Sequence, residues 1–237
     1  MRSNWFVRQE AESDWVSISD LMSVLMIMFL FIAIVFMHNL QQDQLSIEKV
    51  AVAYQELQIN LYEELAEEFK DDLKDWGATI EKETLTIRFQ EPDVLFDMGS
   101  AKLTKRFRDI LIDFFPRYIS VIFSAKYKDN IEEIRIEGHT SSEWTKDADE
   151  NESYFGNMAL SQNRTRSVLK YSLSVLSNVE HHSWTKRYIT ANGLSSSRLI
   201  LNNEGKEDKQ KSRRVEFRTK TNAEKKVVEI IERFKNI

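Results

Sequence analysis

The sequence predicts a single transmembrane helix, a helical, coiled-coil-like linker and a C-terminal α/β sandwich. Three observations lead to this fold class. About 17 consecutive apolar residues run from Leu21 to Met37, nearly enough to cross a bilayer. An uninterrupted apolar stripe with helical spacing follows this run. Beyond Gly77, short strand patterns alternate with helical ones.

Composition narrows the function classes. The chain has 237 residues, a net charge of −5, no cysteine and 2 prolines. The roughly 200 residues after the apolar run are enough for one well-buried domain and a connecting segment. The lack of cysteine excludes disulfides and thiolate metal sites. The mildly acidic total argues against nucleic acid as a partner.

We expect residues 1–19 to form an N-terminal tail and residues 20–38 to form the transmembrane helix. The apolar run is longer than that of a signal peptide and has no small-residue cleavage site. It also lacks the polar stripe of a soluble core helix. Arg2 and Arg8 precede the span, whereas residues 38–48 contain no Lys or Arg, so the positive-inside rule predicts a cytoplasmic N-terminus.

Asp20 stands at the start of this span. An acid at the centre of a membrane helix costs about 2.5 to 3.5 kcal/mol, so it rarely persists without a role. The apolar run would measure about 26 Å, slightly less than the hydrocarbon core, which places Asp20 inside the membrane near one edge. The alternative is a solvated acid at the headgroup level that has no function.

Residues 39–77 are predicted to form the helical linker. Its apolar residues recur every three or four positions as one stripe: Ile47, Val50, Tyr54, Leu57, Leu61, Leu65, Phe69, Leu73 and Trp76. Gly77 is expected to end the helix. A stripe of this length suggests pairing with a second copy as a loose coiled coil. The alternative is packing of the last two turns on the following domain.

Residues 78–237 are predicted to form the sandwich, with helices on one side of a small sheet. Strands are expected at 84–89, 131–137, 188–191 and 214–218, with a further short apolar segment at 94–96 and a turn at Gly99-Ser100. Helices are expected at 103–123, with a bend or break near Pro116, at 160–176 and at 223–234.

Four segments of this region resemble the OmpA-like peptidoglycan-binding domain. In that family's order they are Phe96-Asp-Met-Gly-Ser-Ala-Lys-Leu103, Ile136-Glu-Gly-His-Thr-Ser141, Asn157-Met-Ala-Leu-Ser-Gln-Asn-Arg164 and Arg213-Arg-Val-Glu-Phe217. The four-part pattern is specific, although each piece alone would be weak. The resemblance implies an OmpA-like fold and a peptidoglycan ligand. It also implies binding roles for Asn157, Leu160 and Arg164, with Arg164 holding a ligand carboxylate.

The chain departs from this family after the Gly-His-Thr turn. In the family, an acid at this position and the helix arginine together hold the diaminopimelate of the stem peptide. Ser141 and Ser142 stand here instead, followed by Glu143. The ligand ammonium therefore loses its expected counter-charge unless Glu143 or Asp97 supplies it. The resemblance implies wall binding that is weakened or retuned.

Plainer interpretations exist for three residues. Arg164 could form a structural ion pair on a helix surface, and Asn157 could cap a helix that starts near Leu160. Arg214 belongs to a basic stretch that could attract wall carboxylates or could be a solvated edge strand protected by charge. We count Ser141, Asp97 and Arg214 among the predicted wall-binding residues.

No arrangement of residues points to an enzyme, a cofactor or a metal site. The histidines are His38, His139, His181 and His182, and neither a His-Glu-x-x-His nor a thiolate spacing occurs. His181 and His182 are expected on a solvent-facing loop. A phosphate-binding Gly-rich loop and a nucleophile elbow are also absent.

The order of parts resembles the B subunits of proton-driven stator complexes, the flagellar MotB class. The resemblance implies that Asp20 picks up and releases the conducted ion, expected to be a proton, with Ser23 one turn further on the same helix face. Ionised Asp20 is costly in low dielectric, so protonation is favoured. The span has no second charge, so partner helices from a multi-span A subunit must complete the channel. The resemblance implies that this subunit is MotA-like and forms a ring around a homodimer of this chain.

Within that class, the sequence most resembles the B subunits of Zorya anti-phage systems. Flagellar B subunits usually begin with a strongly basic tail, whereas this tail is nearly neutral. The segment Gly138-His-Thr-Ser-Ser-Glu143 also fits the Zorya type better. The resemblance implies a bacterial inner-membrane location, a ZorA-like partner and a periplasmic domain tethered to the wall. A flagellar stator subunit and a passive wall tether without conduction are the alternatives.

Overall fold

The structure is a computed structural model that describes residues 4–90, 92–97, 99–223, 225, 226, 228 and 232. The chain divides into two compact units, residues 1–52 with 227–237 and residues 53–226, and each is described by itself. The predicted closing helix at 223–234 lies largely outside the described residues.

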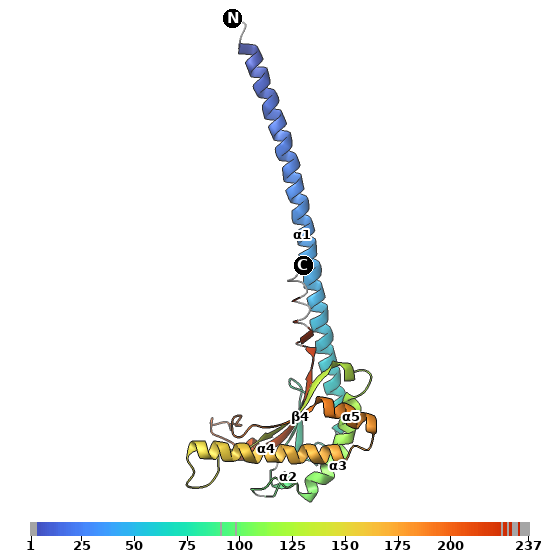
Figure 1. Ribbon diagram of the computed structural model, residues 1–237, viewed down its shortest axis with the longest axis vertical. Coiled ribbons are helices and arrows are strands. Elements are labelled where there is room, and N and C mark those ends of the chain that lie inside the picture. Colours follow the sequence, from blue (N-terminus) through green and yellow to red (C-terminus); the bar gives the residue numbers. More distant parts are fainter. Residues whose placement is uncertain are drawn as a thin grey trace. The chain divides into compact units, whose positions relative to one another are not determined.

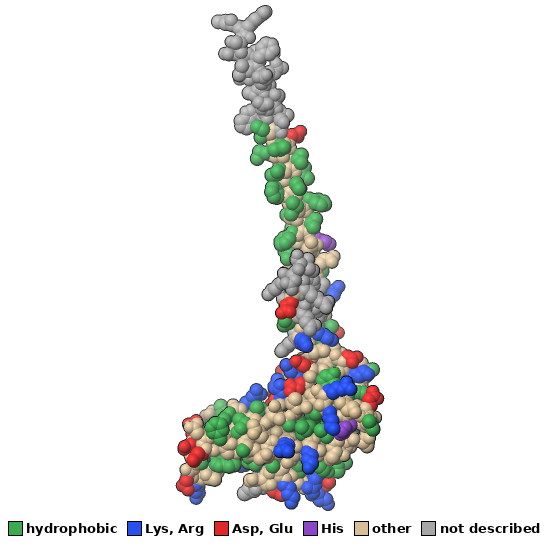
Figure 2. Space-filling view, viewed as in Figure 1, with side chains coloured by type: hydrophobic (Ala, Val, Ile, Leu, Met, Phe, Trp, Pro, Cys, Tyr) green, Lys and Arg blue, Asp and Glu red, His purple; other side chains and the backbone are tan. Residues whose placement is uncertain are grey.

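The first unit contains most of helix α1 (Asn4–Phe69) (Figure 1). Its segment Ile18–Gln42 is long and apolar enough to cross a membrane, with a mean hydropathy of 2.6, and none of it is buried. Figure 2 shows apolar side chains along this segment. Among the described helices, no other segment has this length and hydropathy. The prediction of one N-terminal apolar helix is confirmed.

Helix α1 ends earlier than predicted. It ends at Phe69, and residues 70–77 form turns instead of continuing the helix to Trp76. Gly77 has a φ of +60°, and the N–H of Ala78 donates to the carbonyl oxygen of Leu73 over 2.8 Å. This left-handed residue with a six-to-one hydrogen bond is a Schellman stop. Gly77 therefore ends a helical turn as expected, but that turn is separate from α1.

The end of the apolar stripe belongs to the core of the second unit. Leu61, Leu65 and Phe69 are fully buried there, and Leu57 packs partly against them. Leu57 to Phe69 spans about three and a half helical turns, more than the last two turns that the sequence suggested. Because its own domain covers this part of the stripe, it is not available to a coiled-coil partner.

Five strands form one sheet in the order β1-β2-β5-β3-β4. They are β1 (Ala78–Glu81), β2 (Thr86–Phe89), β3 (Ile131–His139), β4 (Ile189–Gly193) and β5 (Arg214–Thr221). The β3–β4 pair is parallel, and the other three pairs are antiparallel. Strand β1 was not predicted, because four residues with one clear alternation cannot be distinguished from a loop.

The helices of this unit are α2 (Pro92–Leu95), α3 (Lys105–Ile122), the 3-10 turn η1 (Lys128–Asn130), α4 (Glu150–Ser174), α5 (Val179–Tyr188) and α6 (Lys209–Ser212). Helix α3 is continuous through Pro116. The short apolar segment 94–96 contributes to the one-turn helix α2 and to a single bridge between Phe96 and Leu103.

Two further expectations about helices are wrong. Helix α4 begins at Glu150 and not near Leu160, because Asp149 and Glu152 form a capping box at its start. His181 and His182 lie on α5 and not on a loop. The ring of His181 packs against Phe123, with ring centres 4.6 Å apart.

The core lies between one face of the sheet and the helices that cover it (Figure 1). The ring of Phe114 on α3 lies 5.1 Å from Phe89 on β2 and 5.0 Å from Phe217 on β5. Helix α4 crosses β4 so closely that a Cβ atom on Gly193 would lie 2.3 Å from the backbone nitrogen of Gln162. Helices packed on one side of a small mixed sheet confirm the predicted sandwich.

Candidate functional site

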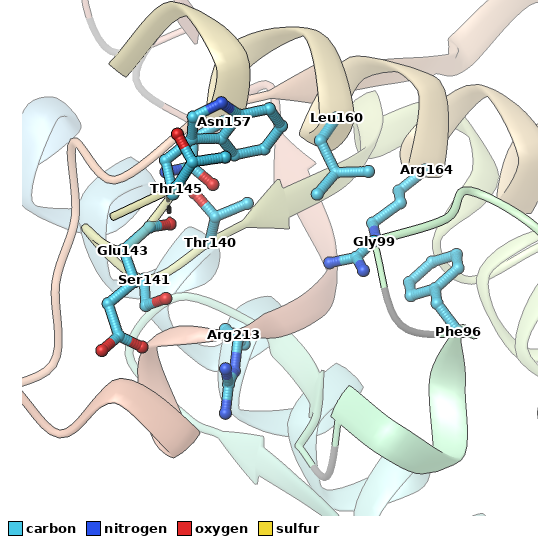
Figure 3. A pocket seen from close by; sticks show the side chains of 11 residues that line it. Phe96, Gly99, Thr140, Ser141, Glu143, Thr145, Asn157, Leu160, Arg164 and Arg213 are labelled. Carbon is cyan, nitrogen blue, oxygen red and sulfur yellow. Dashed lines mark hydrogen bonds between the residues drawn. The ribbon is translucent and has the colours of Figure 1, made fainter. Parts of the chain in front are cut away.

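A pocket of about 390 Å³ opens beside the first half of α4 (Figure 3). It is lined by residues from the turn after α2, the segment after β3, helix α4 and the position before β5: Phe96, Gly99, Thr140, Ser141, Glu143, Trp144, Thr145, Asn157, Leu160, Arg164 and Arg213. The structure therefore brings four of the predicted wall-binding residues, Ser141, Asn157, Leu160 and Arg164, around one cavity. Asp97 and Arg214 do not line it.

Arg164 is fixed at the edge of this pocket. Its Nε donates to the carbonyl oxygen of Ser100 over 2.9 Å, and its guanidinium carbon lies 4.8 Å from the centre of the Phe96 ring. Figure 3 shows the guanidinium pointing into the pocket. Burial, together with the like charge of Arg213, lowers the pKa of Arg164 to about 10, so it stays charged at neutral pH. Within the described residues it has no carboxylate partner, so it is not a structural ion pair.

Arg213 supplies the second guanidinium of the pocket. It follows α6 and directly precedes β5. Its Nε is buried without a hydrogen-bond partner, and no described carboxylate forms an ion pair with it. Arg214 lies on the opposite side of the sheet, where its Nε donates to Glu216 Oε1 over 2.7 Å. The alternation of β5 explains this difference, because Val215 and Phe217 face the core and their even-numbered neighbours face away.

The polar wall of the pocket contains Thr140, Ser141 and Asn157. Thr140 and Ser141 are 2% and 3% exposed, and the Oγ1 of Thr140 has no hydrogen-bond partner among the described residues. Asn157 lies within α4, so it does not cap the helix. Its Nδ2 donates to the carbonyl oxygen of Glu143 over 3.0 Å and thereby holds the segment after β3 against α4.

The carboxylates around this pocket already have cationic or polar partners. Glu143 Oε1 accepts from Lys209 Nζ over 2.5 Å, and this hydrogen bond holds the pKa of Glu143 below its usual range. Glu207 accepts from the backbone N–H of Ser142 over 2.9 Å. The exposed Asp97 lies 4.0 Å from Lys102. Thus neither Glu143 nor Asp97 offers an unpaired charge next to Arg164.

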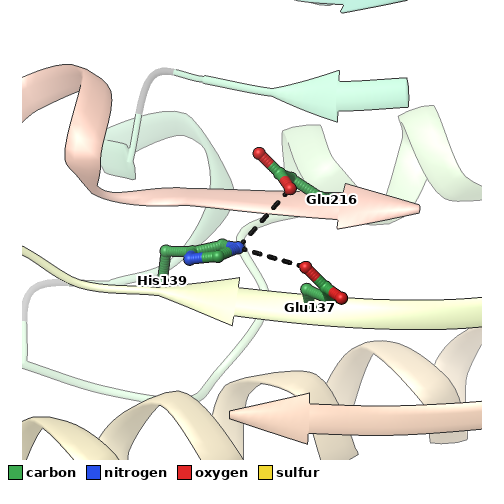
Figure 4. Close-up of side chains that lie close together, drawn as sticks. All are labelled: Glu137, His139 and Glu216. Atoms are coloured by element: carbon green, nitrogen blue, oxygen red, sulfur yellow. Dashed lines mark ion pairs between the residues drawn. The ribbon is translucent and has the colours of Figure 1, made fainter. Parts of the chain in front are cut away.

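A second polar cluster, missed in the sequence, lies on the sheet face away from the helices (Figure 4). Glu137, His139 and Glu216 are 1%, 3% and 6% exposed. His139 Nε2 lies 3.5 Å from Glu216 Oε2 and 3.7 Å from Glu137 Oε2. Four arginines pair with the two carboxylates: Arg88 and Arg214 with Glu216, and Arg135 and Arg198 with Glu137.

This cluster has the donor atoms for a metal ion but not the charge. One ligand atom from each residue lies within 4.8 Å of the others. However, the surrounding guanidiniums already balance the carboxylates, and a divalent cation would add further buried positive charge. Within the part of the chain that the structure describes, His139 Nδ1 also has no partner that would orient the ring as a ligand. We therefore interpret the cluster as a structural charge network.

Asp20 and Ser23 lie three residues apart and are exposed on α1. Ser23 Oγ donates to the carbonyl oxygen of Ser19 over 2.8 Å. Asp20 has no hydrogen bond or ion pair with any other described residue. It is the one Asp, Glu, Lys or Arg in the apolar segment Ile18–Gln42.

Comparison with known protein families finds no match for the chain. The chain is 47% identical over 225 residues to Zorya protein ZorB of Escherichia coli, with 95% of each chain covered. It is similar in structure to a MotB-like protein from Desulfovibrio vulgaris, with a TM-score of 0.52, 22% identity, and coverage of 72% of this chain and 98% of that one. The periplasmic domain of Helicobacter pylori MotB gives a TM-score of 0.43, 18% identity, and coverage of 64% and 87%.

Proposed function

The chain belongs to the ZorB family, and from this premise we propose that it is the ion-conducting B subunit of a wall-anchored, proton-driven motor in the bacterial inner membrane, used in anti-phage defence. It spans the membrane once, with its N-terminus in the cytoplasm and its domain in the periplasm. Two copies stand inside a ring of multi-span ZorA-like subunits, which resemble MotA. The observation that carries the proposal is the carboxylate of Asp20, the one acid in the apolar segment, which forms no ion pair with a described residue.

Asp20 is the proposed proton site of the motor. An isolated carboxylate in low dielectric is stabilised by binding a proton and destabilised by releasing it. Moving one charge through 100 mV supplies about 2.3 kcal/mol, which can bias a conformational step in the surrounding subunits. Ser23, on the same helix face, supplies a hydroxyl beside the ion path. The partner subunits provide the remaining polar groups.

The α4 pocket is the proposed peptidoglycan site. Arg164 and Arg213 present two guanidiniums that have no carboxylate partner within the described residues. Stem peptides of peptidoglycan carry carboxylates, which guanidinium groups bind well through paired hydrogen bonds. Leu160 and Trp144 add apolar contact area to the same cavity. Anchoring the domain in this way lets the membrane segment do work against a fixed scaffold.

The test of conduction is Asp20→Asn, which keeps the shape of the side chain and removes its titrating proton. We expect loss of phage protection and of proton flux in proteoliposomes that contain the A subunit, with unchanged co-purification of both subunits. Glu48→Gln is the matched control, because Glu48 is an exposed carboxylate on α1 beyond the apolar segment. Full activity of Asp20→Asn would support a passive tether instead.

The test of anchoring is sedimentation of the full-length protein in detergent with purified peptidoglycan. We expect Arg164→Ala combined with Asn157→Ala to abolish co-sedimentation. Arg166→Ala is the control, because Arg166 is exposed on the same helix and does not line the pocket. Undiminished binding by the double variant would reject the pocket as the wall site.

A further inference from the structure

The charges that line the α4 pocket do not balance. Neither Arg164 nor Arg213 forms an ion pair with a carboxylate in the described part of the chain, and their like charges oppose each other. The charge of Arg213 also acts at longer range on Glu143, where it helps to lower the pKa of that carboxyl. The carboxylate that lines the pocket, Glu143, is paired with Lys209. The pocket is therefore lined by two guanidinium groups without an ion pair and by one carboxylate that is already paired.

We propose that this pocket selects a peptide group that carries two carboxylates and no ammonium, which in peptidoglycan is a stem peptide whose side-chain amine is already acylated in a cross-link. The inference rests on the proposed wall-binding function and specifies its substrate. It assigns Arg213 as a specificity-determining residue beside Arg164, and Ser141 as the residue that removes the preference for a free amine.

The polar wall supports this assignment. Thr140 and Ser141 are almost fully buried, and no residue that the structure describes forms a hydrogen bond with the Thr140 Oγ1. Hydroxyl groups can donate to or accept from a neutral amide, but they cannot neutralise an ammonium ion. An ammonium placed in this pocket would meet two guanidiniums and no unpaired carboxylate, and such like-charge contacts are unfavourable in a partly buried site.

The chemistry of peptidoglycan supplies such a ligand. In an uncross-linked stem, the side-chain amine of the diamino acid is charged at neutral pH. In a cross-link the same nitrogen is an amide and carries no charge, while the free carboxylate of that residue and the C-terminal carboxylate remain. Two guanidiniums can bind these two carboxylates, each as a bidentate pair. Binding is non-covalent, and no bond is made or broken.

The experiment compares two synthetic stem tetrapeptides that contain the diamino acid, one with a free side-chain amine and one with that amine acetylated. Binding to the full-length protein in detergent is measured by calorimetry. We expect the acetylated peptide to bind at least tenfold more tightly. Tighter binding of the free-amine peptide would overturn the inference while leaving wall binding intact. Absence of binding to both peptides and to purified peptidoglycan would overturn the proposed wall-binding function as well.

Two variants assign the selectivity to residues. Ser141→Asp places an acid beside the two arginines, so we expect it to reverse the preference toward the free-amine peptide. Arg213→Gln should weaken binding of the acetylated peptide by about tenfold to a hundredfold, the loss expected for one charged hydrogen-bonded pair. Arg166→Gln is the matched control and should leave both affinities unchanged. An unchanged preference in Ser141→Asp, with a normal circular dichroism spectrum, would refute the role of Ser141.

Discussion

Replacing Glu216 with glutamine removes the buried negative charge that Arg88 and Arg214 share. The Nε atoms of these arginines lie 2.6 and 2.7 Å from Glu216 Oε1, and Glu216 is 6% exposed. Removing one partner of a buried ion pair costs about 3 to 5 kcal/mol, because the remaining charge stays buried without compensation. Glutamine keeps one acceptor oxygen, so we expect the lower end of this range, about 3 kcal/mol.

The pH dependence of this effect follows from the direction of the pKa shift. Burial alone would raise the pKa of Glu216, but His139 and Arg214 outweigh burial and hold it below its usual range. The carboxylate therefore stabilises the fold fully above its unfolded pKa of about 4.3. This stabilisation is lost as the pH falls toward the folded pKa. The difference between the wild type and Glu216→Gln should therefore be present at pH 7 and shrink as the pH falls below about 4.

The assay is thermal unfolding of the full-length protein in detergent, followed by near-UV circular dichroism. A loss of 3 kcal/mol corresponds to a decrease in Tm of about 6 to 12 °C for a domain of this size. Glu204→Gln is the control, because Glu204 is 70% exposed and pairs with Lys206 on the surface. We expect it to change Tm by less than about 2 °C. If Glu216→Gln matched this control at pH 7, the interpretation of the cluster as a stabilising charge network would be wrong.

Three further predictions concern packing, and each can be measured by unfolding of the same full-length protein. Leu65→Ala should lower the free energy of unfolding by about 2 to 5 kcal/mol, because Leu65 is fully buried. The control Val52→Ala, at a position that is 46% exposed, should lower it by less than about 0.5 kcal/mol. Equal effects of the two variants would refute the placement of the end of α1 in the core. Gly193→Ala should destabilise by about 1 to 3 kcal/mol, since its Cβ would meet the backbone of α4, and an unchanged Tm would contradict that close approach. Gly156→Ala should leave Tm unchanged or raised, because alanine favours the helix more than glycine does. It should nevertheless weaken co-sedimentation with peptidoglycan, because the new Cβ would lie 2.4 Å from the Trp144 indole that lines the pocket. Normal co-sedimentation would show that this ring does not shape the site.

The apolar patterns predicted the layers of the fold well because burial follows periodicity. Phe107, Ile110 and Phe114 recur every three or four positions in the sequence, and all three are buried on α3. Short elements without a complete period were missed, such as β1 and α2. The early start of α4 was readable in principle, because Asp149 and Glu152 have the spacing of a capping box.

The pocket could be predicted in part. The motif residues Asn157, Leu160 and Arg164 recur on one face of a helix, so the sequence places them together. The choice between Arg213 and Arg214 depended on the phase of β5. Since Val215 and Phe217 are apolar, Arg214 had to face the other side, and this signal was overlooked. The pairing of Glu143 with Lys209 joins segments far apart in the chain, which no local pattern shows.

The burial of Leu61, Leu65 and Phe69 also determines how a load on the helix would be transmitted. If a flexible linker joined the helix to the domain, the helix could rotate without turning the domain. Here the last turns of α1 interlock with rings such as Phe114, so this stretch cannot rotate without breaking the aromatic packing beneath it. Torque applied to these turns would therefore be transmitted directly to the sheet, and the end of α1 and the domain would rotate together as one rigid body.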